Sequence, residues 1–96
     1  MARIDLESIQ DIVRAADPEG LLANGAPQDE YEPEEDELYA ELEHLPASEI
    51  TEELVRQFLT GIWEAAFDSE SNPEREAGLQ TIVERIVQFF GPDSAY

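Results

Sequence analysis

The fold is decided by residues 48–66, which read SEITEELVRQFLTGIWEAA. Apolar side chains recur there every three or four residues, the spacing that places them on one face of an α-helix. Ser48 is the predicted N-cap, and the glutamates that follow it suit the positive end of the helix dipole. This apolar face is the broadest in the chain, so we expect it to form the centre of the core. Its members are Ile50, Leu54, Val55, Phe58, Leu59, Ile62, Trp63 and Ala66.

An N-terminal helix is predicted over residues 5–16, where apolar side chains again recur at helical spacing and Asp5 is a suitable N-cap. Asp17-Pro18 ends this helix, because the residue before a proline is pushed out of the helical backbone region. A loop rich in turn residues follows. It contains one apolar pair, Leu21-Leu22, which we expect to fasten the loop to the core.

Two further helices are predicted on either side of the central one. The first begins at Pro33 and carries a narrow apolar stripe. The second has Asn72 as its N-cap, begins at Pro73, runs to about Phe90 and stops at Gly91-Pro92. No segment alternates with the period of a strand. The stripe of the helix that begins at Pro33 consists of Leu38, Leu42 and Leu45.

These segments predict an all-α fold, a compact bundle of about four helices joined by short loops. The chain has 96 residues, of which 42% are apolar, enough for one core but not for two. We therefore expect a single helical domain over residues 1–96, with an acidic loop and helix at 27–45 and a frayed end at 92–96.

Negative charge is the strongest functional signal. The chain has 24 aspartates and glutamates against five arginines and no lysine, and its net charge is −19. Residues 17–53 contain fourteen of the acids and no arginine, and nine of those lie between residues 29 and 43. Such a surface repels nucleic acid and anionic lipid and attracts cationic protein. We expect a basic protein partner, no nucleic acid and no membrane.

The composition excludes several other classes of protein. Cysteine is absent, which removes disulfides, thiolate metal sites and cysteine nucleophiles. The first residues, MARIDLESIQDIV, lack the apolar stretch of a secretory signal, and no run approaches the roughly 20 apolar residues of a membrane span. We expect a soluble, cytoplasmic protein.

The order of features between residues 17 and 42 resembles that of a known protein family. The run DPEGLL at 17–22 is followed by PQDEYEPE at 27–34 and then by a helix with Leu38 and Leu42. This resembles the YugE-like family of small acidic bacterial helical proteins of unknown function, although a tryptophan often precedes the Asp-Pro there and Ala16 stands in its place. The resemblance implies a small all-helical fold and no particular activity.

Catalytic and metal-binding patterns are weak. Glu41 and His44 have the Glu-x-x-His spacing of di-iron helical bundles, but His44 is the only histidine and such sites need the motif twice. Asp68, Glu70 and Asn72 have the 1, 3, 5 spacing of an EF-hand loop, but Pro73 replaces the required glycine. The chain also lacks a phosphate-binding glycine loop and a Ser-His-Asp pattern. We expect no enzyme activity, no metal and no cofactor.

The predicted partner-binding surface combines the acidic loop with the helix that follows it. Carboxylates around Tyr31 suggest an aromatic anchor in a charged interface. The alternative is that Asp29 or Glu30 bonds the backbone of the turn while Tyr31 packs on the loop as a hydrophobic staple. The predicted contact residues are Asp29, Glu30, Tyr31, Glu32, Glu34, Glu35, Asp36, Glu37, Tyr39 and Glu41.

An immunity- or antitoxin-like inhibitor of a basic protein, such as a nuclease, is the leading functional hypothesis. The main alternative is a structural or regulatory homo-oligomer, because the pairs Phe89-Phe90 and Trp63 with Phe67 should leave some aromatic surface exposed. A third reading is adaptation to high salt, which also produces acidic, lysine-poor chains. That adaptation should spread acids over every exposed face, whereas here they are concentrated in the middle of the chain.

Overall fold

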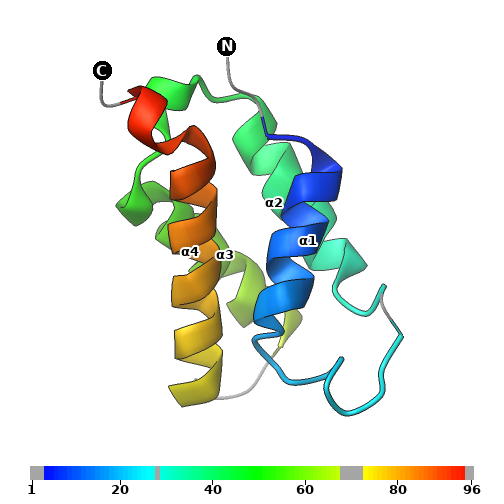
Figure 1. Cartoon of the computed structure of the whole chain (residues 1–96). Helices are drawn as coiled ribbons and strands as arrows, with labels where there is room; N and C mark the ends of the chain where they lie inside the picture. Colours follow the sequence, from blue (N-terminus) through cyan, green and yellow to red (C-terminus); the bar gives the residue numbers. More distant parts are fainter. Residues whose placement is uncertain (1–3, 28, 68–72, 95–96) are drawn as a thin grey trace.

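The computed structural model describes residues 4–27, 29–67 and 73–94. This part of the chain contains helices and no β-strand, which confirms the predicted all-α fold. Figure 1 shows the helices in chain order. They are α1 (Leu6–Ala16), α2 (Glu32–Glu43), the short 3₁₀ helix η1 (Ala47–Glu49), α3 (Glu52–Ala66) and α4 (Pro73–Ser94).

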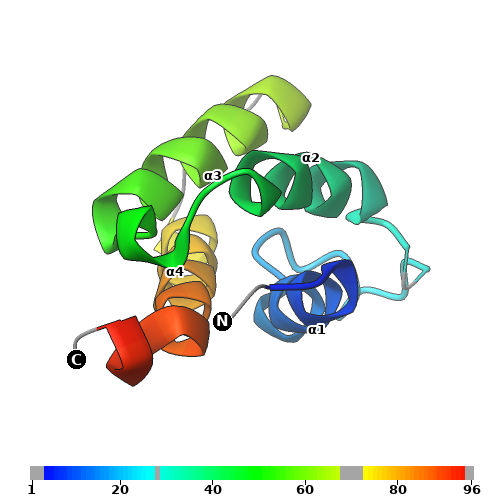
Figure 2. The same cartoon turned by 90° about the horizontal axis from the view of Figure 1, so that it is seen from above.

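The four α-helices form a ring in which each helix packs against two others. Helix α1 contacts α2 and α4, and α3 contacts the same two helices, so α1 and α3 lie opposite each other. Figure 2 shows this arrangement from above. The seam between α2 and α3 therefore lies on the opposite side of the bundle from the seam between α1 and α4.

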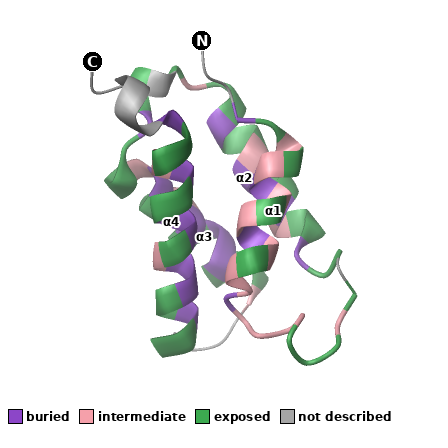
Figure 3. Ribbon diagram, viewed as in Figure 1, coloured by how far each residue is buried: buried purple, intermediate pink, exposed green. Residues whose placement is uncertain are grey.

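Apolar side chains from all four α-helices fill the space inside the ring. Figure 3 shows buried residues as stripes along the helices, with exposed residues between them. The loop residues Leu21 and Leu22 are half-buried and pack against this core, as predicted. The core residues with at most 1% exposure include Ile9, Val13, Leu38, Val55, Leu59, Trp63, Ile82, Val83 and Ile86.

Helix α1 begins and ends at the predicted residues. The Oδ1 atom of Asp5 accepts a hydrogen bond from the backbone N–H of Ser8 at 2.8 Å, which caps the helix. The helix ends at Ala16, and the φ of its C-cap Asp17, 45°, lies in the left-handed region. Few residues other than glycine adopt this conformation, although aspartate and asparagine tolerate it best.

Helix α3 begins later than predicted. Residues 47–49 form the separate helix η1, and Thr51 rather than Ser48 caps α3 by accepting the backbone N–H of Leu54 at 3.2 Å. Thr51 has the extended backbone of an N-cap, with φ −117° and ψ 161°. Because the helix starts at Glu52, Ile50 lies before it in the core. The buried face consists of Val55, Leu59, Ile62 and Trp63, while Leu54 and Phe58 are half-buried and Ala66 is exposed.

The ends of α2 and α4 also differ from the prediction. Helix α2 begins at Glu32 and ends before Leu45, which is half-buried beyond it. Helix α4 begins at Pro73 as predicted but continues through Gly91-Pro92 to Ser94. A proline inside a helix loses the hydrogen bond of its own N–H and crowds the carbonyl four residues earlier, and glycine is a weak helix former. Both weaken a helix without excluding one more turn. The predicted cap Asn72 lies outside the described residues.

Candidate partner-binding surface

Tyr31 does not lie on the surface, so the structure corrects its predicted role as a partly buried aromatic anchor for a partner. Its side chain is 0% exposed. The ring stacks on Trp63 with centroids 5.9 Å apart and meets the edge of Phe67 at 6.3 Å. The hydroxyl donates to Oδ1 of Asp17 at 2.7 Å and accepts the backbone N–H of Glu19 at 3.0 Å. Tyr31 therefore holds the α1–α2 loop against the core. This role resembles the alternative in which Tyr31 packs on the loop as a hydrophobic staple.

The Asp17 carboxylate organises the same loop. Besides the Tyr31 hydroxyl, it accepts the backbone N–H groups of Leu22 at 3.1 Å and Ala23 at 3.0 Å. Burial acts to raise the pKa of Asp17, but these hydrogen bonds to the charged form outweigh it and the pKa is lowered. The same bonds supply partners for loop backbone groups, which allows the left-handed turn at Asp17.

Glu19 connects this loop to the far side of the bundle. Its Oε2 accepts the indole N–H of Trp63 at 2.9 Å, and its Oε1 accepts Nη2 of Arg75 at 3.1 Å. Arg75 is only 4% exposed and lies over the ring of Phe67, 6.0 Å from its centroid. Trp63 and Phe67 also contact each other; Trp63 is buried and Phe67 is half-buried. Phe89 is 40% exposed, which confirms the expectation that the two aromatic pairs would leave some aromatic surface exposed.

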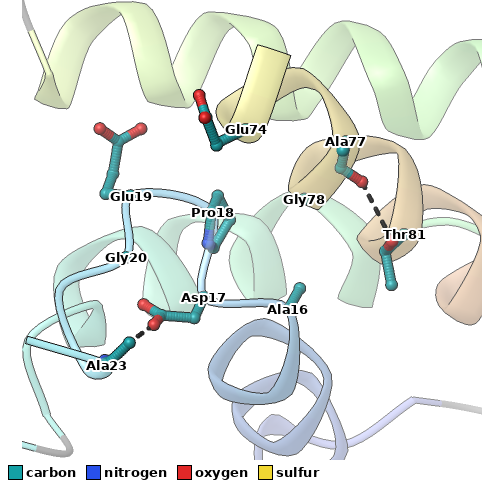
Figure 4. Close-up of a pocket in the computed structure, with 10 residues that line it drawn as sticks. All are labelled: Ala16, Asp17, Pro18, Glu19, Gly20, Ala23, Glu74, Ala77, Gly78 and Thr81. Carbon is teal, nitrogen blue, oxygen red and sulfur yellow. Dashed lines mark hydrogen bonds between the residues drawn. The ribbon is translucent and has the colours of Figure 1, made fainter. Parts of the chain in front are cut away.

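A cavity of about 630 Å³ lies between this loop and the first turns of α4 (Figure 4). Asp17 and Glu19 line it, but both carboxylates are bonded within the protein, as the preceding contacts show. Among the described residues, every buried side-chain polar atom has a hydrogen-bond partner. The cavity thus presents no unpartnered buried group to a ligand, and we interpret its surroundings as the packing of the loop on α4.

Glu35 is the second predicted contact residue that does not lie on the surface. Its side chain is 0% exposed and forms a two-pronged ion pair with Arg14 of α1, with Nε–Oε2 at 3.1 Å and Nη2–Oε1 at 3.2 Å. Burial raises the pKa of Glu35 above its ordinary value, and the Arg14 guanidinium opposes that rise. This carboxylate joins α1 to α2 and is not available to a partner.

The other predicted contact residues separate into two groups. Tyr39 is half-buried and packs against the core. Glu34 is also half-buried; burial raises its pKa, and the neighbouring carboxylates of Glu35 and Glu37 raise it further. The carboxylates that remain exposed are Asp29, Glu30, Glu32, Asp36, Glu37 and Glu41.

Helical spacing divides the acids of α2 between its sides. Residues three and four apart lie on the same side of a helix, so Glu34, Glu37 and Glu41 form one row. Glu37 and Glu41 line the seam with α3, which places this row on the α3 side. Glu35, bonded to Arg14, lies on the α1 side. We call Glu34, Glu37 and Glu41 the carboxylate row.

A groove of about 380 Å³ lies along the seam between α2 and α3. This groove is not predicted from the sequence, because it forms only where two helices that are separate in the sequence meet. The one available signal was Gly61, a glycine in the middle of a predicted helix. The groove is lined by Glu37, Ala40 and Glu41 from α2 and by Gln57, Phe58, Gly61 and Ile62 from α3.

The described part of the chain offers little support for a metal site or a membrane-spanning helix. It contains no group of three or more histidine, cysteine or acidic residues placed to hold a metal ion. His44 is exposed at the C-terminal end of α2, and the EF-hand-like acids at 68–72 lie outside the described residues. None of the described helices has both the length and the apolar character to cross a membrane.

Comparison of the chain with protein-family models, with curated proteins and with solved structures gave no match. The resemblance to the YugE-like family therefore stays a prediction from the motifs at residues 17–34. Those motifs do have a structural explanation. Asp17 and Tyr31, one from each run, are hydrogen-bonded to each other.

Proposed function

We propose that this chain is a non-enzymatic acidic binding protein that recognises a basic surface of a partner protein through α2 and the loop before it. The observation that carries the proposal is the carboxylate row on one side of a regular helix. The arginine–carboxylate pairs of the described residues lie elsewhere, from Arg14, Arg56 and Arg75 to other acids. The charge of the row is therefore open to an external cation.

A cationic effector such as a nuclease fits this surface best. Nuclease active sites are positive because they hold phosphate groups, and the acids between residues 29 and 43 follow one another at a density comparable with the phosphates of duplex DNA. Complementary charge speeds association and selects against partners of the same sign. In this proposal the protein acts in the cytoplasm as an immunity- or antitoxin-like inhibitor of its partner.

The homo-oligomer alternative receives less support. Trp63 is buried and Phe67 is half-buried, so Phe89 is the one large apolar side chain of the described residues that is exposed, at 40%. A stable interface needs roughly 800 Å² per partner, far more than one side chain provides. The net charge of −19 also opposes the association of identical chains.

The test is a pull-down from the source cells with the wild type and with the triple variant Glu34→Lys, Glu37→Lys, Glu41→Lys. Glu35 is left unchanged because its loss would disturb the α1–α2 contact. The matched control is Glu7→Lys, Glu76→Lys, Glu84→Lys, which changes the net charge equally at exposed positions of α1 and α4. Circular dichroism checks that both variants remain folded.

We expect the wild type and the control to retain a basic protein at low salt, and the carboxylate-row variant to lose it. The purified partner should then bind with an association rate that falls steeply as salt increases, and its activity on nucleic acid should be inhibited. Equal retention by the folded row variant would overturn the proposal.

A further inference from the structure

We infer that the α2–α3 groove is the apolar part of the partner-binding surface and that it binds one apolar side chain of a partner helix. That helix carries lysine or arginine on both sides of the apolar side chain. This inference rests on the proposed function and names the element that the surface recognises. Because Tyr31 is buried, the aromatic anchor expected from the sequence is not on the surface, and the groove is the nearest apolar site to the carboxylate row.

The floor of the groove is apolar and open. Phe58 is half-buried there and presents carbon surface to solvent, while Ile62 beneath it is 7% exposed. Ala40 and Gly61 are small, and a Cβ atom built at Gly61 would meet nothing within 4 Å. Glycine weakens a helix interior relative to alanine, and none of the described neighbours requires its small size. The open space at Gly61 would allow an element of a partner protein to lie close to α3.

The α2 wall of the groove is acidic. Glu37 and Glu41 line its α2 side, and Glu34 continues the row one turn earlier. On α3, Glu53, Gln57, Gly61 and Glu64 are three or four residues apart, so the glutamates lie at either end of the open stretch around Gly61. All of them except the half-buried Glu34 are exposed. An apolar floor beside a row of carboxylates on α2, with single glutamates at the two ends of the α3 side, is complementary to an apolar side chain between cations.

A helix is the partner element that matches this spacing. Glu37 and Glu41 are four residues apart, about 6 Å along the axis of α2, and cations four residues apart on an adjacent helix have the same separation. The small side chains of Ala40 and Gly61 allow a helix to lie close to the seam. Insertion of an apolar residue from an amphipathic helix into such a groove is a common mode of peptide recognition.

The test uses two synthetic lysine-rich helical peptides that differ only at the central position, which is leucine in one and alanine in the other. Their affinities for the full-length protein are measured by fluorescence anisotropy at low salt. The groove variant is Gly61→Gln, which covers the floor with a neutral, helix-compatible side chain. The control is Thr60→Gln, an exposed position that lies one helical turn after Arg56, whose side chain reaches Gln80 of α4.

We expect the wild type and Thr60→Gln to bind the leucine peptide roughly tenfold or more tightly than the alanine peptide, the ratio that burial of most of a leucine side chain provides. In Gly61→Gln the two peptides should bind equally. If both peptides bind the wild type with the same affinity, the groove does not bind an apolar side chain, although the acidic surface still binds cations. If neither peptide binds, both the inference and the proposed function are overturned.

Discussion

The two sides of α2 use the same residue type in opposite ways. On the side that faces α1, Glu35 is fully buried and both of its oxygens are bonded to Arg14. On the side that faces α3, Glu37 and Glu41 are exposed along a groove and are not in the ion pairs of the described residues. The same contrast separates Asp17 and Glu19, which bond the loop to the core, from the exposed acids that follow in the sequence.

The difference shows that charge density along the chain does not say what an acid does. An acid is structural where hydrogen-bond donors from other elements reach it and water does not, because an unpaired buried carboxylate is costly. It is available to a partner where it is solvated and its neighbours are other acids. The fourteen acids of residues 17–53 contain both kinds.

The largest expected effect comes from Tyr31→Ala, on the buried side of this comparison. The change removes a fully buried ring from between Trp63 and the loop and leaves the Asp17 carboxylate without its hydroxyl donor. Truncations of this kind cost about 3–5 kcal/mol of the free energy of unfolding. Urea denaturation monitored by circular dichroism measures it. A loss below about 1 kcal/mol would mean that Tyr31 is not part of the core in solution.

The next effect comes from Arg14→Met, which leaves the carboxylate of Glu35 buried without its cation. Removing one partner of a buried pair costs about 3–5 kcal/mol, and we expect the lower end because the Arg14 side chain is 26% exposed. Glu37→Gln is the matched control from the exposed side and should change the free energy of unfolding by no more than about 0.5 kcal/mol. Equal effects of the two substitutions would remove the distinction between the two sides of α2.

Two glycines allow the same comparison with a smaller change. A Cβ atom at Gly78 would lie 2.7 Å from Cα of Pro18, so Gly78→Ala should force the loop away from α4 and cost about 1–3 kcal/mol. Gly61→Ala meets nothing within 4 Å and should stabilise α3 by about 0.5–1 kcal/mol. Thermal melts of the two variants should therefore shift in opposite directions. A destabilised Gly61→Ala would show that the groove is closed in solution.

The smallest expected effect is the response to mild acid. Burial raises the pKa of Glu35 above its ordinary value of 4.5, so its protonation is easier in the folded chain and the melting temperature should rise as the pH falls from 7 to 4.5. The hydrogen bonds to Asp17 lower its pKa below 3.8, so the stability that they provide should be lost as the pH falls further. Glu35→Gln should weaken the rise and Asp17→Asn the later fall. A melting temperature that declines continuously from pH 7 would contradict this assignment.

The helices were predictable because their apolar residues follow helical spacing, most clearly in α1 and α3. The start of α3 was not, because Ser48 and Thr51 are both acceptable caps and only tertiary packing selects Thr51. The α2–α3 groove was also out of reach, since nothing in a linear pattern says which helices become neighbours.

The burial of Glu35 had a signal that the density of acids concealed. Tyr31, Glu35, Leu38 and Leu42 are spaced four, three and four residues apart and therefore share the inward face of α2. An acid on an apolar face predicts a buried ion pair. The partner itself, Arg14, is 21 residues away in the sequence and could be identified only from the fold.

Because of the hydrogen bond between Trp63 and Glu19, tryptophan fluorescence can follow the folding of this protein. Trp63 is the only tryptophan, and its indole N–H is bonded to a carboxylate that lies 44 residues earlier in the chain. Its emission therefore depends on whether the α1–α2 loop has reached α3, whereas far-ultraviolet circular dichroism depends on whether the helices have formed. Stopped-flow refolding followed by both signals can separate the formation of helices from the docking of the loop, without any added label.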